Sequence, residues 1–209
     1  MAQKDVGNKV PIHKLKTTDE VKEFYDDWGD KGKYNEDMLD WNYTGPKETV
    51  NTFKKYAKNK EILIFDAGCG TGLVGKELKK CGYNNLDGAD LSQTLLDSIP
   101  KNLYKKLNRI DLNQPIKVND SSYDAVMCVG TFTYVHVKPN ALDEFVRITK
   151  NKGLICFTIN EGIHEEYGFD KKIEELEKKN KWKKIEFFKS EYIASKDVNA
   201  WLGLYEVIK

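Results

Sequence analysis

The sequence lacks several features that would each point to a particular class of protein. Its four cysteines include no C-x-x-C pair, so small buried thiols are the simplest interpretation and no metal site is expected. No N-terminal apolar segment has the length expected of a signal peptide, and no apolar run approaches the ~18 residues of a membrane span. We therefore expect a reduced, cytoplasmic protein without membrane contact.

The sequence also has almost no net charge. Thirty-four Lys and Arg residues face 33 Asp and Glu residues, which leaves a formal charge of +1 and no general attraction for nucleic acid or an anionic membrane. The lysine-rich segment "KKIEELEKKNKWKK" is interpreted as a solvated helix face. The 209 residues, 40% of them apolar, are enough for one core. Partners must therefore be sought at a specific site.

Short apolar runs alternate with helical patterns along most of the chain. Strands are expected at 61–67, 83–91, 105–112, 123–132 and 153–160. Helices are expected between them at 72–82, 92–99 and 140–153, the last with lysines in its final turn. Such alternation predicts a parallel sheet with helices on both faces.

The two ends of the chain differ from this pattern. The first sixteen residues lack periodicity and predict a loose lead-in, and two helices, started by the capping box at Thr17 and by Thr44 and Pro46, precede the first strand. A helix at 171–180 precedes two consecutive strands, 181–190 and 200–209. We expect one domain with a Rossmann-like, doubly wound α/β sheet of seven strands. The sheet is mostly parallel with an antiparallel C-terminal edge strand, and a helical cap or lid (1–60) is integrated with the core (61–209).

The stretch "IFDAGCGTGLVG" places Gly68, Gly70 and Gly72 directly after the first strand. Open sheets of this kind bind ligands at the carboxyl ends of their strands, and glycines there let the backbone approach a ligand closely. The glycines fit two patterns. "GTGLVG" matches the G-x-G-x-x-G pattern of dinucleotide binders, whereas the segment from Asp66 onward has the pattern D-x-G-x-G-x-G.

Asp66 favours the second pattern, because a carboxylate would repel a pyrophosphate and would help a ligand that brings an ammonium group to the loop. Asp90 ends the second expected strand, where its carboxylate can accept hydrogen bonds from both hydroxyls of a ribose. An adenosine that carries a positively charged amino-acid tail meets both requirements.

The sequences "DAGCGTG", "GADLS" and "RIDLNQPI", followed by "YDAVMCVGTF", resemble the motif series of class I S-adenosylmethionine-dependent methyltransferases. A closer likeness, carried by "FYDDWGDKGKYNEDM" and "LYKKLNRIDL" among other segments, is to the Williams-Beuren region methyltransferase-like proteins. The resemblance implies an enzyme with S-adenosyl-L-methionine as cofactor and S-adenosyl-L-homocysteine as product.

The resemblance also implies roles for individual residues. Those expected to bind the cofactor are Tyr25, Tyr34, Asp66, Gly68, Cys69, Gly70, Gly72, Asp90, Leu91, Asp111, Leu112, Val129 and Gly130. Those expected near the methyl acceptor are Trp28, Thr131, Phe132, Asn160 and Tyr167, with His136 as the candidate general base. In this arrangement Asp66 reaches the cofactor's amino group directly or through water, Asp90 holds the ribose, and Asp111 with Leu112 lies at the adenine edge.

Each role has a simpler alternative. Asp90 and Asp111 fit turn formers at strand ends, Cys69 fits a small filler, and the tyrosines and Trp28 fit helix-to-sheet packing. A lone histidine such as His136 is often structural, and the same holds for Asn160 with its neighbour Glu161. These alternatives remain open at the level of sequence.

The acceptor is expected to be a small molecule rather than nucleic acid. No [DNS]-P-P-[FYW] tetrapeptide follows the fourth expected strand, and the chain has room for neither an added recognition domain nor a basic groove. Two alternatives to a methyltransferase are a non-catalytic cofactor-binding module and an NAD-type oxidoreductase that uses "GTGLVG". The methylated atom (N, O or S), the oligomeric state and regulation are not specified by this sequence.

Overall fold

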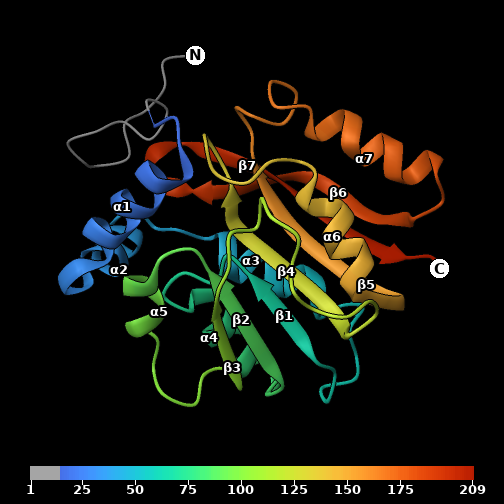
Figure 1. Cartoon of the computed structure of the whole chain (residues 1–209), viewed down its shortest axis with the longest axis horizontal. Helices are drawn as coiled ribbons and strands as arrows, with labels where there is room; N and C mark the ends of the chain where they lie inside the picture. Colours follow the sequence, from blue (N-terminus) through green and yellow to red (C-terminus); the bar gives the residue numbers. More distant parts are fainter. Residues whose placement is uncertain (1–14) are drawn as a thin grey trace.

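The computed structural model describes residues 15–209 of the chain. One seven-stranded sheet runs through its centre, with helices on both faces (Figure 1). The strands lie in the order β3-β2-β1-β4-β5-β7-β6, and all neighbours are parallel except the two pairs that include β7. The Rossmann-like fold class predicted from the sequence is confirmed.

The strands are β1 (Ile64–Ala67), β2 (Leu86–Asp90), β3 (Lys106–Arg109), β4 (Tyr123–Phe132), β5 (Thr149–Asn160), β6 (Trp182–Ile193) and β7 (Val198–Val207). The α-helices are α1 (Thr18–Gly29), α2 (Lys33–Asp40), α3 (Gly45–Phe53), α4 (Leu73–Lys80), α5 (Gln93–Asp97), α6 (Ala141–Ile148) and α7 (Phe169–Lys178). Two short 3-10 helices are η2 (Asp30–Gly32) and η3 (Ala194–Lys196).

The N-terminal part contains one more helix than expected. The capping box forms as predicted: the Thr17 hydroxyl accepts the Glu20 N–H at 3.2 Å, and the Glu20 carboxylate accepts the Thr17 N–H at 3.0 Å. The prediction of two helices before the first strand is wrong, because a left-handed turn at Gly32 (φ +78°) starts the short α2, of which only Met38 is buried. The expected lead-in, apart from Leu15 and Lys16, lies outside the described residues.

Each face of the sheet has its own apolar core. Helices α6 and α7 cover one face with side chains that include Phe145 and Phe169, and α3 and α4 cover the other with side chains that include Phe53. Strand β4 serves both cores, because alternate residues of a strand point to opposite faces: Val126 packs on one side and Met127 on the other. Helix α3 is therefore part of the sheet's packing, whereas α1 and α2 lie beside it (Figure 1).

The end of one helix and the order of the last two strands differ from expectation. The helix predicted over 140–153 ends at Ile148, because Thr149 is already extended, pairs with Tyr123 and donates its hydroxyl to the Phe145 carbonyl at 2.6 Å. The lysines expected in the last helical turn therefore lie in β5. The C-terminal β7 is antiparallel as expected, but it lies between β5 and β6, so β6 forms the edge of the sheet.

The order of the strands places a switch point between β1 and β4. From β1 the chain builds β2 and β3 on one side, and from β4 it builds the remaining strands on the other. Connections that leave in opposite directions open a crevice at the carboxyl ends of these strands. Within the described part of the chain, no helix has the length and apolar character needed to cross a membrane.

Candidate active site

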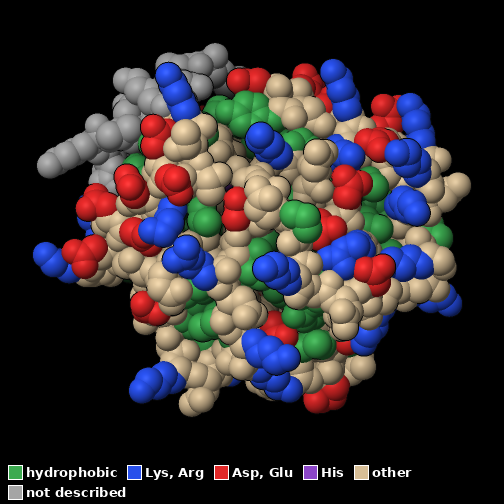
Figure 2. Space-filling model, viewed as in Figure 1, with side chains coloured by type: hydrophobic (Ala, Val, Ile, Leu, Met, Phe, Trp, Pro, Cys, Tyr) green, Lys and Arg blue, Asp and Glu red, His purple; other side chains and the backbone are tan. Residues whose placement is uncertain are grey.

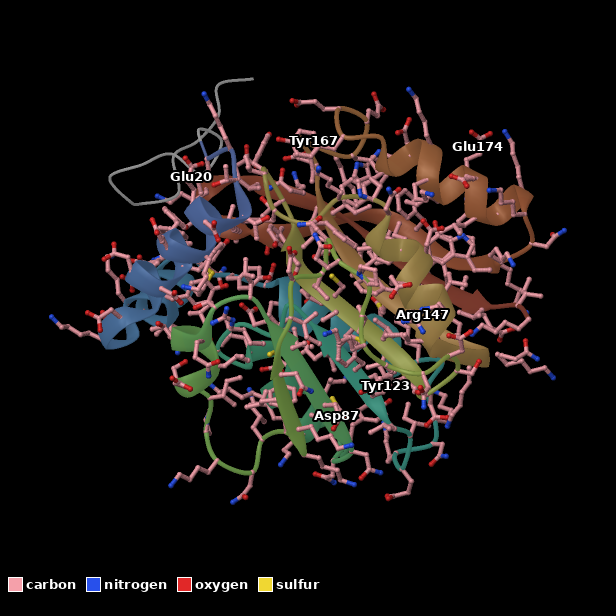
Figure 3. The ribbon with its side chains drawn as sticks, in the orientation of Figure 1. Glu20, Asp87, Tyr123, Arg147, Tyr167 and Glu174 are labelled. Atoms are coloured by element: carbon pink, nitrogen blue, oxygen red, sulfur yellow. The ribbon has the colours of Figure 1, made fainter. Side chains whose placement is uncertain are left out.

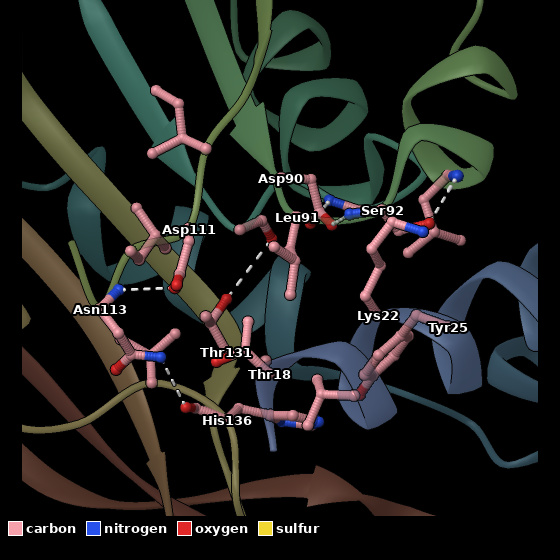
Figure 4. A pocket seen from close by; sticks show the side chains of 18 of the residues that line it. Thr18, Lys22, Tyr25, Asp90, Leu91, Ser92, Asp111, Asn113, Thr131 and His136 are labelled. Carbon is pink, nitrogen blue, oxygen red and sulfur yellow. Dashed lines mark hydrogen bonds between the residues drawn. The ribbon is translucent and has the colours of Figure 1, made fainter. Parts of the chain in front are cut away.

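A cavity lies at the carboxyl ends of β1, β2 and β4, where α1 and α2 approach the sheet (Figure 4). Its empty volume is about 730 Å³, including space open to solvent. The cavity therefore lies where a nucleotide-like ligand is expected to bind in this fold.

Backbone from the glycine loop forms one wall of this cavity. The N–H groups of Gly68 and Cys69 both donate to the Ala89 carbonyl, at 2.8 and 2.9 Å, which curls the loop over β2. Gly68 has φ +77°, and a Cβ there would lie 2.0 Å from the Thr131 Oγ1. Gly70 (φ +52°) also lines the cavity, and no atom lies within 4 Å of where its Cβ would be. The loop thus leaves open space next to its backbone.

Asp90, the last residue of β2, presents its carboxylate to the cavity. Its Oδ2 accepts the Gly70 N–H at 2.8 Å, and its Oδ1 accepts the Ser92 N–H at 2.9 Å. Burial raises the pKa of this carboxyl group, although the two N–H donors oppose the rise. Because each carboxylate oxygen has two lone-pair sites, both retain capacity for a further hydrogen bond.

Asp111 lines the cavity beyond the neighbouring strand β3. Its Oδ1 accepts the Asn113 N–H at 2.9 Å, and no hydrogen bond within residues 15–209 occupies its Oδ2. The side chains of Leu91, Ile110 and Leu112 line the same region. Apolar side chains next to a carboxylate suit a flat heterocycle with polar edges.

Asp66 lies behind the loop and does not line the cavity. Its side chain is fully buried; the Oδ2 accepts the Tyr104 hydroxyl at 2.6 Å, and the Oδ1 has no hydrogen-bond partner among the described residues. Burial raises its pKa to about 7, the Tyr104 hydroxyl lowers it, and Asp90 raises it. The expected contact between Asp66 and a cofactor amino group is therefore not direct in this arrangement.

Aromatic side chains from α1 and α2 form the opposite wall. Tyr25 and Tyr34 line the cavity, as expected for a lid. Trp28 does not line it: the indole is buried, packs on Tyr34 at 4.9 Å between ring centroids, and donates its Nε1–H to Asp37 at 2.7 Å. Trp28 thus holds the lid together.

Two side-chain hydrogen bonds join this lid to the sheet loops, and sequence reasoning missed both. The Ser92 hydroxyl donates to Asp26 of α1 at 2.5 Å, and the Thr71 hydroxyl donates to the Asn35 side-chain oxygen of α2 at 2.6 Å. Ser92 also accepts the Leu95 N–H as N-cap of α5, so one residue links the lid, α5 and Asp90. Its position directly before a helical pattern was the available signal.

His136 lies on the loop after β4 and lines the cavity opposite Asp90 (Figure 4). Its ring centroid is 5.1 Å from that of Tyr25, and its Nε2 is buried without a hydrogen-bond partner among the described residues. Burial lowers its pKa to about 4, so the imidazole is neutral at neutral pH. The preceding Val135 has φ +64°, a strained conformation for a β-branched residue.

Val129, Gly130 and Thr131 at the end of β4, three of the predicted site residues, also line the cavity. Gly130 has φ +82° and donates its N–H to the Thr158 hydroxyl at 3.1 Å, at a point where the β4–β5 register shifts. This irregularity turns the end of β4 toward the cavity.

The other candidates lie elsewhere. Gly72 (φ +82°) is the N-cap of α4, and burial raises the pKa of the Cys69 thiol, which disfavours its thiolate form. Phe132 packs in the core against Phe169 at 4.7 Å, and Asn160 accepts the Gly162 N–H. Tyr167 lines a second hollow, on the segment before α7 (Figure 3).

Further residues that line the cavity were not predicted, and most are side chains from elements already expected there. They are Thr18, Val21, Lys22, Ser92, Leu95, Ile110, Asn113, Val135 and Val137. No group of three or more His, Cys, Asp or Glu side chains within residues 15–209 is arranged to hold a metal ion.

Comparisons with known sequences give a consistent result. A family model described as a methyltransferase domain matches residues 65–157. Human methyltransferase-like protein 27 is 34% identical over 139 residues, which are 65% of this chain and 56% of that protein. An uncharacterized protein of Methanocaldococcus jannaschii is 34% identical over 160 residues, 74% of this chain and 68% of that protein. The matches thus span between about half and two thirds of these relatives.

Solved structures share the fold at lower identity. A chain of the complex between the Haloferax volcanii Trm112 methyltransferase activator and a methyltransferase has a TM-score of 0.65 and 17% identity, covering 88% of this chain and 98% of that one. An S-adenosylmethionine-dependent methyltransferase of Thermotoga maritima has a TM-score of 0.61 and 18% identity, with 90% and 99% coverage. At such identities the likeness concerns the fold alone.

Proposed function

The chain belongs to the class I S-adenosylmethionine-dependent methyltransferases, and from this premise we propose that it methylates a small-molecule acceptor on N, O or S. One observation carries the proposal most directly: the open glycine loop, Asp90 and Asp111 all line one cavity at the switch point of the sheet. The glycine loop after β1 would lie along the methionine part of the cofactor, Asp90 at the end of β2 along the ribose, and Asp111 after β3 along the adenine.

The residues in the cavity fit this cofactor. Asp90 would accept from the ribose hydroxyls with the oxygen capacity that Gly70 and Ser92 leave, and Leu91 and Leu112 would pack on the adenine. Asp111 would accept from the exocyclic amine through its unoccupied Oδ2. Gly68, Gly70, Val129 and Gly130 would line the methionine part with backbone.

Bound S-adenosyl-L-methionine supplies an activated methyl group on a sulfonium, and its product is S-adenosyl-L-homocysteine. The protein's contribution is to hold the two reactants in line and to exclude water, which can lower a barrier by up to ~7–11 kcal/mol. Tyr25 and Tyr34, on the helices proposed as a lid, would cover the reacting atoms.

A general base is needed only when the acceptor arrives protonated. His136 is the candidate for this role: it is neutral at neutral pH and its Nε2 has no partner among the described residues, but burial lowers its pKa to about 4 and so weakens it as a base. We expect His136→Asn to lower kcat at least about tenfold for a protonated acceptor. The effect should shrink as pH rises through the pKa of that acceptor, which a pH profile of kcat measures.

The distribution of charged side chains on the surface is consistent with a small-molecule acceptor. Lysine and arginine side chains alternate with acidic ones on the face shown in Figure 2 and form no continuous basic groove there. This argues against nucleic acid as the acceptor. The four cysteines are free thiols, which agrees with a reducing cytoplasmic location.

The proposal is tested by calorimetry with S-adenosyl-L-methionine, S-adenosyl-L-homocysteine and NAD, followed by a release assay for S-adenosyl-L-homocysteine over a metabolite library. We expect binding of the first two compounds, none of NAD, and turnover with at least one acceptor. Cofactor binding without turnover on any acceptor would favour a non-catalytic module, and binding of NAD alone would favour an oxidoreductase.

A further inference from the structure

A second hollow adjoins the proposed methyl-transfer cavity. It lies between the loop after β4 and the start of α7, with an empty volume of about 1150 Å³ that includes open solvent. Val135, His136 and Val137 line both spaces. The two spaces therefore share one three-residue segment of the loop after β4.

The charge of this hollow differs from that of the whole chain. Among residues 15–209, four lysines line it against a single acidic residue, Glu175, whereas the full chain has a formal charge of only +1. The lysines are Lys16, Lys138, Lys171 and Lys172. The hollow is thus a local concentration of positive charge next to the reacting centre.

Only part of this charge is neutralised within the protein. Lys172 pairs with Asp143 at 3.0 Å and with Glu175 at 2.9 Å. The ammonium groups of Lys138 and Lys171 make no ion pair or hydrogen bond within residues 15–209, and both side chains are exposed. Asp170, in the first turn of α7, does not line the hollow. Two cationic groups on different elements therefore face a shared space without an acidic partner.

Other features of the hollow also favour the binding of an anionic ligand. Gly168, the N-cap of α7, offers no side chain to cap the first turn, and no atom lies within 4 Å of where its Cβ would be. Helix N-termini favour negative charge. Tyr167 and Pro139 add apolar surface between the lysines and His136, so the hollow can also hold a carbon skeleton.

We propose that the methyl acceptor carries a carboxylate or phosphate group that binds between Lys138 and Lys171, while the atom to be methylated extends past His136 toward the cofactor. This inference rests on the proposed function, and it names the chemical class of the acceptor: a small organic oxyanion. The lysines act by binding and orientation, and the methyl-transfer step is unchanged.

The test titrates succinate and glycerol 3-phosphate, with succinamide and glycerol as neutral analogues, into the full-length protein saturated with S-adenosyl-L-homocysteine. Calorimetry should show saturable binding of at least one anion and none of the neutral analogues; preference between the two anions separates a carboxylate from a phosphate. The double variant Lys138→Gln/Lys171→Gln should weaken that binding about fivefold or more. The exposed pair Lys58→Gln/Lys101→Gln, which removes the same charge elsewhere, should not.

Each contrary result has a defined meaning. Absence of saturable anion binding, equal binding of the neutral analogues, or equal loss in both double variants would overturn the proposal. Thermal melting of both variants checks that they remain folded, as expected for exposed side chains. Titration of the same samples with S-adenosyl-L-homocysteine tests the proposed function separately, because both double variants should keep the cofactor affinity of the parent protein.

Discussion

The two walls of the cavity are built in different ways. The sheet wall consists of backbone and carboxylates whose positions follow from the register of β1, β2 and β4. The lid wall consists of aromatic side chains on α1 and α2, which two side-chain hydrogen bonds, Ser92 to Asp26 and Thr71 to Asn35, join to the sheet loops. The comparison indicates that changes in the sheet wall should affect folding and cofactor affinity strongly, and changes in the lid wall weakly.

The largest effect is expected at Gly68. Gly68→Ala adds a Cβ that would meet the Thr131 side chain, at a φ of +77° that disfavours alanine. We expect a loss of about 2–4 kcal/mol in the free energy of unfolding, measured by denaturant titration. Gly82→Ala, also at positive φ (+88°) but with the nearest non-adjacent atom of the described residues 3.9 Å away, on the Lys60 side chain, is the control for backbone strain alone. Equal losses in the two variants would refute the close-approach argument.

Asp90→Ala should weaken cofactor binding at least about tenfold, or about 1.4 kcal/mol, because it removes the acceptor for two ribose hydroxyls. The variant also leaves the Gly70 and Ser92 N–H groups without their acceptor. Calorimetry with S-adenosyl-L-homocysteine measures the change. Unchanged affinity would show that Asp90 does not bind the cofactor. Asp111→Ala tests the neighbouring carboxylate in the same assay.

The raised pKa of Asp66, which lies behind the glycine loop of the sheet wall, should make the stability of the protein depend on pH. Its pKa of about 7 in the folded protein is above the ordinary value of 3.8 for an aspartate, so the folded state retains a proton that the unfolded state loses. The contribution of Asp66 to stability therefore falls as pH rises through 7. Between pH 6 and pH 8, the stability of Asp66→Asn relative to the parent protein should increase by about 1 kcal/mol. Chemical unfolding without cofactor measures it; a pH-independent difference would mean that the burial of Asp66 does not shift its pKa.

The smallest effect is expected in the lid. Asp26→Ala removes the acceptor of the Ser92 hydroxyl and should cost about 1 kcal/mol of stability and no more than a few-fold in cofactor affinity. Asp27→Ala, at an exposed neighbouring position, should change neither the stability nor the cofactor affinity. A loss of affinity at Asp26 as large as that at Asp90 would show that the two walls bind the cofactor equally.

Features set by backbone periodicity were predicted most accurately from the sequence. The positions of Asp90 at the end of β2 and of Asp111 just beyond β3 follow from hydrophobic runs and their spacing, and both residues line the cavity. Predictions were less accurate for side chains whose direction depends on distant contacts. Phe132 ends β4 within the run predicted to reach the acceptor, yet it points into the core toward Phe169, 37 positions later in the chain.

The sequence by itself determined the alternation of elements, the glycine loop and the carboxylates at successive strand ends, because these depend on local periodicity and on residue chemistry. Only the tertiary structure decided that Asp66 lies behind the loop against Tyr104, that Ser92 and Thr71 hold the lid, and that Lys138 and Lys171 face one hollow beside His136. The physical reason is that each of these contacts joins segments far apart in the chain, and no local pattern specifies which side chains meet when the sheet folds.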